Sequence, residues 1–275
     1  MAAKNVANVY EARIRRADYL ATAHPFSQEI LLFYKRIAEF QKNFGSRLLT
    51  TYAPVARESI PSSLRQELRT DGLLRGFKEF LILVAEHGPA ALAGSAQQLA
   101  NAASESWAVL LQEYWSANGD DDKPDAAFEQ FLPRAFLQPY AELLAGHHAA
   151  SEMPAGGPRC PLCDARPLLG VLRPEGDGGK RFLLCSFCLR EWEFRRIFCA
   201  ACGEETETKL PVYVAEQFPY IRIEACETCK FYLRTIDLTK DGNAVPLVDD
   251  LAAIPLSLWA EEHGYSRVQP NLLGT

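Results

Sequence analysis

The chain has 275 residues, enough for one or two domains, and its 48% hydrophobic content is enough to fill ordinary globular cores, which excludes an intrinsically disordered chain. It carries 29 basic and 35 acidic residues, a net charge of -6, with 15 against 18 up to residue 157 and 14 against 17 beyond it. Neither part has the basic excess that phosphate binding favours, which argues against a nucleic-acid-binding protein.

Residues 1–150 contain no cysteine, and their apolar residues recur at helical spacing. The best-defined stretch starts after Pro25 and Ser27, and Phe44-Gly45 is expected to end it. Its apolar face is formed by Ile30, Phe33, Ile37, Phe40 and Phe44. We therefore predict an α-helical bundle for residues 1–150.

Three further helical regions are predicted in this part of the chain. The second is interrupted near Gly72, and the third starts at Pro89. The fourth contains Pro133 and Pro139 and is expected to break near them, because proline cannot donate the helical hydrogen bond. Residues 151–158 are rich in Pro and Gly, which indicates a linker to a second, different fold.

All eight cysteines lie beyond this linker, in four Cys-x-x-Cys pairs with none left over. The pairs are Cys160/Cys163, Cys185/Cys188, Cys199/Cys202 and Cys226/Cys229. A pair of this spacing can point both sulfurs at one metal, and two pairs on facing hairpins supply the four thiolates of a tetrahedral site. The simplest interpretation is two metal ions, each held by four cysteines.

The spacing favours pairing in sequence order, because 21 residues separate the first two pairs, 23 separate the last two, and 10 join the two sites. This is the pattern of a tandem repeat, with crossed pairing as the less favoured alternative. We predict two metal modules, residues 159–192 and 193–238, each a three-stranded ribbon of the rubredoxin-like or zinc-ribbon type. Alternating polar and apolar residues predict strands at 191–195 and 220–224.

A Cys-x-x-Cys turn that binds metal is called a knuckle. The residue after its second cysteine often takes a left-handed backbone conformation, which favours Gly, Asn or Asp. Asp164 and Gly203 follow the leading pair of each module and suit that conformation. Leu189 and Lys230 follow the trailing pairs, where the same conformation would be strained. We therefore expect the trailing knuckles to turn differently.

Disulfides and redox-active dithiols are weaker interpretations of the cysteines. The start of the chain lacks an apolar signal core, and no stretch approaches 18 uninterrupted apolar residues, so we expect a cytoplasmic protein without membrane insertion. Disulfides are rare in that reducing compartment, and no βαβ unit surrounds the pairs as a thioredoxin-like dithiol would need. Four thiolates close the coordination shell, which predicts structural or electron-carrying metals, either iron or zinc.

Residues 239–275 are predicted to form a turn, a C-terminal helix interrupted at Pro255, and a tail, which completes an α+β architecture. The pair Asp249-Asp250 near the start of this helix is interpreted as a helix cap or as a partner contact. Arg190 and Arg195 lie near the link between the two modules. They form either a solvated strand edge, paired with Glu191 and Glu193, or a surface for a partner.

Outside the cysteines, the sequence offers no pattern of catalytic residues. It has no Gly-rich phosphate loop, no His-Glu-x-x-His and no nucleophile elbow. No catalytic residue is therefore assigned, and the chain is not expected to be an enzyme.

The residues around the four pairs follow a particular order. They are Arg-Cys-Pro-Leu-Cys at 159–163, Phe-Leu-Leu-Cys-Ser-Phe-Cys-Leu-Arg-Glu-Trp at 182–192, Cys-Ala-Ala-Cys-Gly at 199–203 and Glu-Ala-Cys-Glu-Thr-Cys-Lys-Phe-Tyr-Leu at 224–233. Further signatures are Val-Asp-Asp-Leu-Ala at 248–252, Glu-His-Gly-Tyr-Ser-Arg at 262–267, Arg-Arg-Ala at 15–17 and the stretch 24–41. Together these features resemble the formate dehydrogenase accessory proteins of the FdhE type.

The resemblance implies a cytoplasmic protein that is not itself a dehydrogenase. Such proteins are thought to bind the catalytic subunit of a respiratory, molybdenum- or tungsten-dependent formate dehydrogenase before twin-arginine export and to support its maturation, with rubredoxin-like metal modules. All eight cysteines match those of the family, whereas Lys230 stands where many members have Gly. Two alternatives stay open: a rubredoxin-like electron-transfer protein and, less favoured, a nucleic-acid-binding zinc-ribbon protein.

Overall fold

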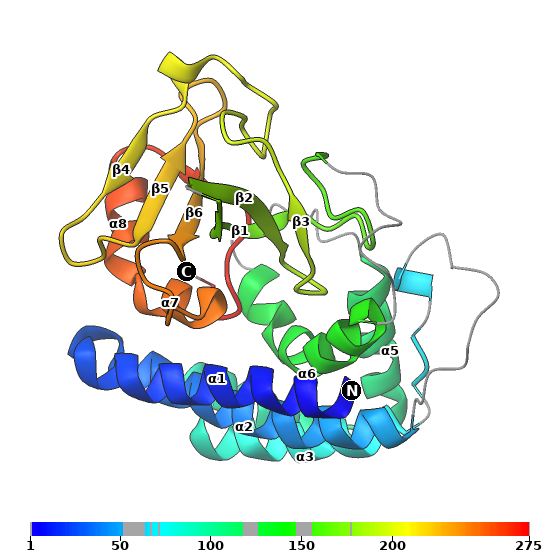
Figure 1. Cartoon of the computed structure of the whole chain (residues 1–275). Coiled ribbons are helices and arrows are strands. Elements are labelled where there is room, and N and C mark those ends of the chain that lie inside the picture. Colours follow the sequence, from blue (N-terminus) through cyan, green and yellow to red (C-terminus); the bar gives the residue numbers. More distant parts are fainter. Residues whose placement is uncertain are drawn as a thin grey trace.

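The computed structural model describes residues 2–51, 64–66, 68–70, 72–117, 126–146, 156–176 and 178–274. It confirms an α+β architecture, in which a layer of helices lies against a β-sheet region that carries both groups of cysteines (Figure 1). Most of the predicted linker at 151–158 falls outside the described residues. No helix in the described part of the chain has the length and apolar character to cross a membrane.

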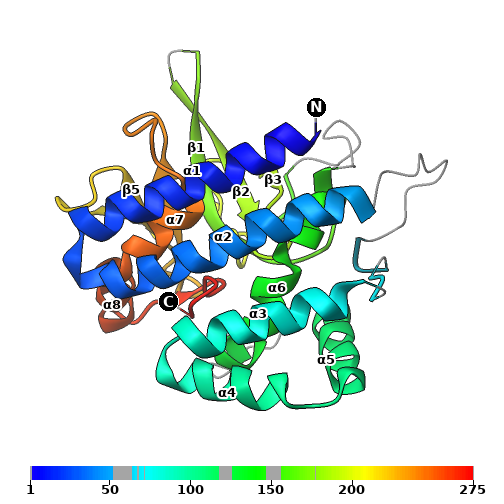
Figure 2. The same cartoon turned by 90° about the horizontal axis from the view of Figure 1, so that it is seen from below.

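The N-terminal part is helical, as predicted. Its elements are α1 (Ala2–Ala23), η1 (Pro25–Ser27), α2 (Gln28–Thr51), η2 (Leu64–Gln66), α3 (Leu73–His87), α4 (Ala90–Ala100), α5 (Ser104–Ser116) and α6 (Ala126–Gly146). Helices α1 and α2 lie side by side, and α3, α4 and α5 lie beyond them (Figure 2). Stacked aromatic rings join α2 to α6, with the ring centroids of Phe44 and Phe136 4.7 Å apart.

Two predicted helix boundaries are wrong. The helix after Ser27 does not end at Phe44-Gly45 but continues to Thr51, because Leu48 extends the buried apolar face by one more turn. The region that starts at Pro89 is two helices, α4 and α5, separated at residues 101–103. Trp107 of α5 stabilises this corner, since its indole N–H donates to the carbonyl of Leu99 at 2.7 Å.

Helix α6 is continuous through Pro133 and Pro139, so the predicted break near these residues is wrong. Pro139 has no N–H to donate to the carbonyl four residues earlier, which belongs to Ala135. The buried Gln41 side chain of α2 donates to this carbonyl instead, at 2.7 Å. The neighbouring helix therefore supplies the hydrogen bond that proline removes, and α6 does not break. In contrast, the predicted interruption at Gly72 is confirmed, because Gly72 precedes α3 with a φ of 86°.

The cysteine-rich part forms one sheet rather than two separate ribbons. Its strands are β1 (Pro167–Glu175), β2 (Gly178–Cys185), β3 (Glu191–Glu193), β4 (Val212–Val214), β5 (Ile221–Ala225) and β6 (Phe231–Asp237), with η4 (Glu207–Lys209) before β4. Two antiparallel, three-stranded ribbons are present as predicted, and they join through a parallel pairing of β1 with β6. The strand order is therefore β3-β2-β1-β6-β5-β4.

The C-terminal part connects the sheet with the helical layer. It contains α7 (Pro246–Ala252), α8 (Ile254–Glu262) and the short β7 (Ser266–Arg267) beside β6. The predicted interruption is confirmed, since α8 starts with Pro255 in its first turn. Helix α7 contacts α1, α2 and β6, so it lies between the helices and the sheet (Figure 1).

Candidate metal centres

The first two Cys-x-x-Cys pairs converge into one cluster. The sulfurs of Cys163 and Cys185 are 3.4 Å apart, and those of Cys160 and Cys188, and of Cys163 and Cys188, are 3.7 Å apart. Four sulfurs at about 2.3 Å from a tetrahedral metal would be about 3.8 Å apart. The observed separations are close to that value and far longer than the roughly 2 Å of a disulfide bond. These four side chains could therefore hold one metal ion.

The last two pairs form a second cluster of the same kind. The sulfurs of Cys199 and Cys229 are 3.7 Å apart, as are those of Cys202 and Cys226. All four sulfurs lie within 4.8 Å of one another. The pairs therefore combine in sequence order, first with second and third with fourth, and crossed pairing is not what the structure shows.

All four knuckles close in the same way. The N–H of each first cysteine donates to the carbonyl five residues later, in Cys160–Ala165, Cys185–Arg190, Cys199–Glu204 and Cys226–Phe231, at 2.8 to 3.0 Å. The residue after each second cysteine is left-handed, with a φ of 58° at Asp164, 52° at Leu189, 80° at Gly203 and 59° at Lys230. The expectation that the trailing knuckles turn differently is therefore wrong. The left-handed conformation costs about 1–2 kcal/mol for a residue with a Cβ, and the closing hydrogen bond offsets this cost.

Comparison with known proteins identifies the family of this chain. The family models for the FdhE central domain and the FdhE C-terminal domain match residues 159–196 and 197–273. A protein FdhE homolog from Aquifex aeolicus is 28% identical over 273 residues, covering 96% of this chain and 95% of that protein. The chain belongs to the FdhE family. A homolog from Pseudomonas aeruginosa is 32% identical over 193 residues, covering 67% of this chain and 61% of that protein.

A solved structure has the same fold over almost the whole chain. The crystal structure of the FdhE protein from Pseudomonas aeruginosa matches with a TM-score of 0.70 and 26% identity, covering 97% of this chain and 96% of that one. The similarity to FdhE proteins therefore includes the helical layer, which lies outside the residues that the two family models match.

In this FdhE family member, the first cluster is enclosed by the helical layer. All four of its cysteines are buried. Arg65 of η2 donates to the carbonyl of Cys163 at 3.1 Å, and its guanidinium lies 4.1 Å from the ring centroid of Phe187. The Phe187 ring in turn packs against Trp115 of α5, with centroids 4.9 Å apart. The buried aromatic side chain of Phe187 therefore covers this knuckle on the side of the helical layer.

The second cluster is more open. Its ligands come from the loops of the second ribbon, on the side of the sheet away from the helical layer (Figure 1). The side chain of Cys202 is exposed and that of Cys229 is partly exposed. Glu204 next to this cluster accepts a hydrogen bond from the Thr228 hydroxyl at 2.6 Å, which lowers the pKa of the Glu204 carboxyl to about 2. A charged carboxylate therefore lies beside the second cluster.

Burial and hydrogen bonds between the thiols both shift the pKa values in the first cluster, and the hydrogen bond with Cys163 foremost lowers the pKa of Cys160. Burial raises the pKa of the Cys185 thiol, and hydrogen bonds with neighbouring thiols, Cys160 foremost, raise that of Cys188. Backbone N–H groups oppose this effect at Cys185, because those of Phe187 and Cys188 donate to its sulfur at 3.3 and 3.4 Å. These donors suit a thiolate bound to a cation, since metal binding requires the deprotonated ligand.

Asp249 is buried where α7 meets α1 and the residue that precedes β5. Its carboxylate accepts the N–H of Val245 at 2.7 Å. Val245 is the N-cap residue of α7 and Asp249 lies within the helix, so Asp249 satisfies a backbone donor at the helix start without itself being the N-cap. It also accepts hydrogen bonds from Arg16 at 2.6 Å and from the Tyr220 hydroxyl at 2.8 Å. Burial raises the pKa of Asp249 in spite of Arg16. Two signatures far apart in the sequence, at 15–17 and 248–252, therefore meet in this ion pair.

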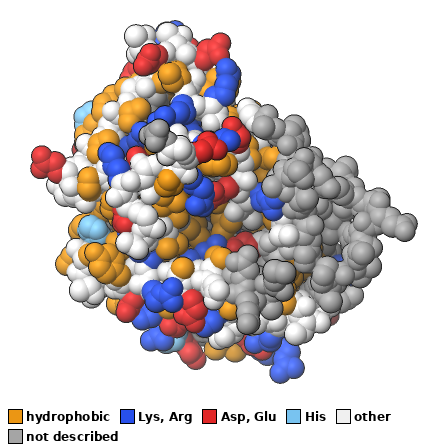
Figure 3. Space-filling model, in the orientation of Figure 1, with side chains coloured by type: hydrophobic (Ala, Val, Ile, Leu, Met, Phe, Trp, Pro, Cys, Tyr) orange, Lys and Arg blue, Asp and Glu red, His pale blue; other side chains and the backbone are white. Residues whose placement is uncertain are grey.

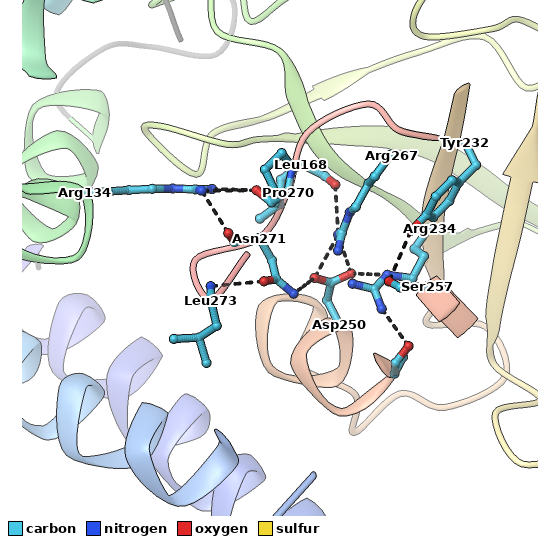
Figure 4. Close-up of polar contacts among 11 residues, drawn as sticks. Arg134, Leu168, Tyr232, Arg234, Asp250, Ser257, Arg267, Pro270, Asn271 and Leu273 are labelled. Atoms are coloured by element: carbon cyan, nitrogen blue, oxygen red, sulfur yellow. Dashed lines mark hydrogen bonds and ion pairs between the residues drawn. The ribbon is translucent and has the colours of Figure 1, made fainter. Parts of the chain in front are cut away.

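Asp250 is buried in a separate network (Figure 4). It forms ion pairs with Arg234 of β6 at 2.8 Å and Arg267 of β7 at 2.7 Å, and it accepts a hydrogen bond from Asn271 at 3.0 Å. Burial disfavours the charged carboxylate, but the two arginines lower the pKa of Asp250 overall. Because Asp249 and Asp250 are both buried, contact with a partner would require this part of the chain to open.

The two arginines proposed as partner contacts lie in different surroundings. Arg190 is half-buried and donates to the carbonyl of Ala145 in α6 at 3.0 Å. Arg195 is exposed, pairs with Glu205 at 3.1 Å and stacks on Phe198. The expected pairing of this patch with Glu191 and Glu193 is not what the structure shows, because Arg173 and Lys180 pair with those carboxylates, at 2.7 and 2.9 Å.

Proposed function

We propose that this protein is a maturation factor that binds the catalytic subunit of a respiratory formate dehydrogenase in the cytoplasm, before export. The proposal is carried by membership of the FdhE family, with similarity to FdhE homologs over nearly the whole chain. In this role the protein acts on another enzyme and does not itself catalyse formate oxidation.

The eight cysteines are proposed to hold two metal ions, iron or zinc, one in each cluster. The sulfur separations of 3.4 to 3.7 Å support this assignment, because they suit a tetrahedral tetrathiolate. Four thiolates leave no position open for substrate, so the ions would be structural or would carry electrons. Elemental analysis of protein purified without oxygen would give the metals, and fewer than one metal per chain would contradict the assignment.

The partner surface is proposed to include Arg195, because its side chain is exposed on the described structure, whereas Asp249 and Asp250 are buried. The charged groups on one face of the molecule are of both signs and intermixed (Figure 3). Such a face suits a protein partner better than the phosphate backbone of a nucleic acid, which needs a basic patch.

A binding experiment tests the proposed function directly. Full-length protein with both metals loaded is titrated, under reducing conditions, into a purified formate dehydrogenase catalytic subunit in a calorimeter. We expect stoichiometric binding, weakened in Arg195→Glu and unchanged in Arg75→Glu, a matched change at an exposed arginine of the helical layer. No binding of the fully loaded protein would contradict the proposal, and equal binding of both variants would remove Arg195 from the surface.

Electron transfer is the second candidate, and the exposure of Cys202 favours it. An exposed ligand brings the metal close to solvent, where a redox partner can approach. This function requires iron at the second cluster and a reversible oxidation that is visible in the thiolate charge-transfer bands. Protein that is isolated with zinc alone and is active in maturation would exclude it.

A further inference from the structure

Arg134 of α6 is a buried cation whose hydrogen bonds go to backbone carbonyls. It is 7% exposed. It donates to the carbonyls of Pro270 at 3.1 Å and Asn271 at 2.9 Å in the C-terminal tail (Figure 4), and to that of Ser186 at 3.5 Å. Among the described residues, no carboxylate forms an ion pair with it. A buried charge of this kind is costly unless a charge of opposite sign lies nearby.

Ser186 lies inside the trailing knuckle of the first cluster, between Cys185 and Cys188. Its carbonyl belongs to the same peptide group as the N–H of Phe187, which donates to the sulfur of Cys185 at 3.3 Å. One peptide group therefore has the guanidinium at its oxygen and the sulfur at its N–H. Hydrogen bonds in such a chain polarise one another, so the positive charge at Arg134 strengthens the donor at the thiolate.

A metal-loaded first cluster would supply the negative charge that the buried Arg134 guanidinium lacks. A divalent metal with four thiolates carries a net charge of −2, and the first cluster is fully buried. This anion and the Arg134 guanidinium are both removed from water on opposite ends of the Ser186–Phe187 peptide group. Each therefore reduces the cost of burying the other.

We propose that Arg134 is a positioning residue that ties metal in the first cluster to α6 and to the C-terminal tail. The inference rests on the metal ligation proposed above. When metal is bound, the negative cluster holds Arg134 in place, and Arg134 holds the tail at Pro270 and Asn271. Asn271 donates to Asp250 at 3.0 Å, so the tail is in turn connected to the network of α7 and the sheet. Loss of the first metal would therefore loosen the contact between the helical layer and the tail.

The test is selective metal release from the full-length, zinc-loaded protein. Excess chelator is added, free thiols are alkylated at intervals, and peptide mass spectrometry counts the cysteines freed in each cluster. We expect Arg134→Met to lose zinc from the first cluster about 10- to 100-fold faster than the parent protein, the usual effect of removing a group that supports a ligand. Arg134→Lys keeps the positive charge but lacks the planar guanidinium that can donate to several carbonyls at once. Its rate of zinc release should therefore lie between those of the parent protein and Arg134→Met.

Arg13→Met is the matched control, because Arg13 is also a buried arginine of the helical layer but pairs with Glu142 at 2.9 Å. It should not release the first zinc selectively. If Arg134→Met does not fold, Arg134→Lys decides the matter by faster release from the first cluster alone. An unchanged first cluster, or equal loosening of both clusters, would overturn the inference. If no zinc binds to the parent protein, the metal ligation itself fails instead.

Discussion

The two cysteine clusters have the same ligands and the same knuckle geometry but different surroundings. All four cysteines of the first cluster are buried beneath Trp115 and Phe187, whereas Cys202 of the second cluster is exposed. Identical ligand sets can therefore serve different purposes. A metal in the first cluster would hold the sheet against the helical layer, and a metal in the second would hold the loops of its own ribbon.

Removing a ligand should show this difference most strongly. We expect Cys185→Ser to cost about 10 kcal/mol, the folding energy of a structural metal, which is comparable with the whole stability of a domain. The first ribbon and its contact with the helical layer should then unfold. Cys226→Ser should unfold the second ribbon and leave the rest of the chain folded. Circular dichroism and elemental analysis of both variants check this, and equal loss of structure would contradict it.

Truncating the aromatic side chain next to each cluster should give a smaller difference in stability between the two clusters. Phe187→Ala should destabilise the protein by about 3–5 kcal/mol, the usual cost of truncating a buried aromatic side chain. Phe198→Ala at the second cluster should cost less, because Phe198 is partly exposed. Urea unfolding followed by tryptophan fluorescence measures both. A cost at Phe198 as large as that at Phe187 would argue against different roles for the two clusters.

The arginines next to the knuckles should show the smallest effects. Arg65→Met leaves the carbonyl of Cys163 without its donor at 3.1 Å and removes the contact with Phe187, so we expect a loss of about 1–3 kcal/mol. Arg195→Met, at the exposed pair with Glu205, should change stability little. Thermal unfolding of the two variants compares them. A similar small change in both would show that Arg65 does not support the first cluster.

The sequence alone allowed a good prediction of the clusters, because a Cys-x-x-Cys knuckle is a local structure and the loop lengths favour neighbouring pairs. It did not predict the parallel pairing of β1 with β6, which joins the two ribbons into one sheet. That pairing connects residues more than 60 positions apart, such as Gly170 and Thr235, and no local pattern specifies it. The left-handed turns at Leu189 and Lys230 were also missed, because knuckle hydrogen bonds override the preference of single residues.

The helical part shows the same limit. Pro139 indicated a broken helix. Helix α6 accommodates this proline because Gln41 of another helix donates to the free carbonyl, and that contact cannot be inferred from the sequence around either residue. Arg16 and Arg134 are each buried against distant partners, which no local pattern in the sequence indicates. Sequence periodicity gives the apolar face of a helix but does not identify a buried charge whose partners come from another layer.

The most direct test of the account is the order in which the two clusters of the unmodified protein release zinc. The loaded protein is treated with excess chelator and a thiol-alkylating reagent, and mass spectrometry identifies the modified cysteines over time. The account predicts that Cys199, Cys202, Cys226 and Cys229 are modified well before the four cysteines of the first cluster. Simultaneous modification of all eight, or earlier modification of the first cluster, would contradict it.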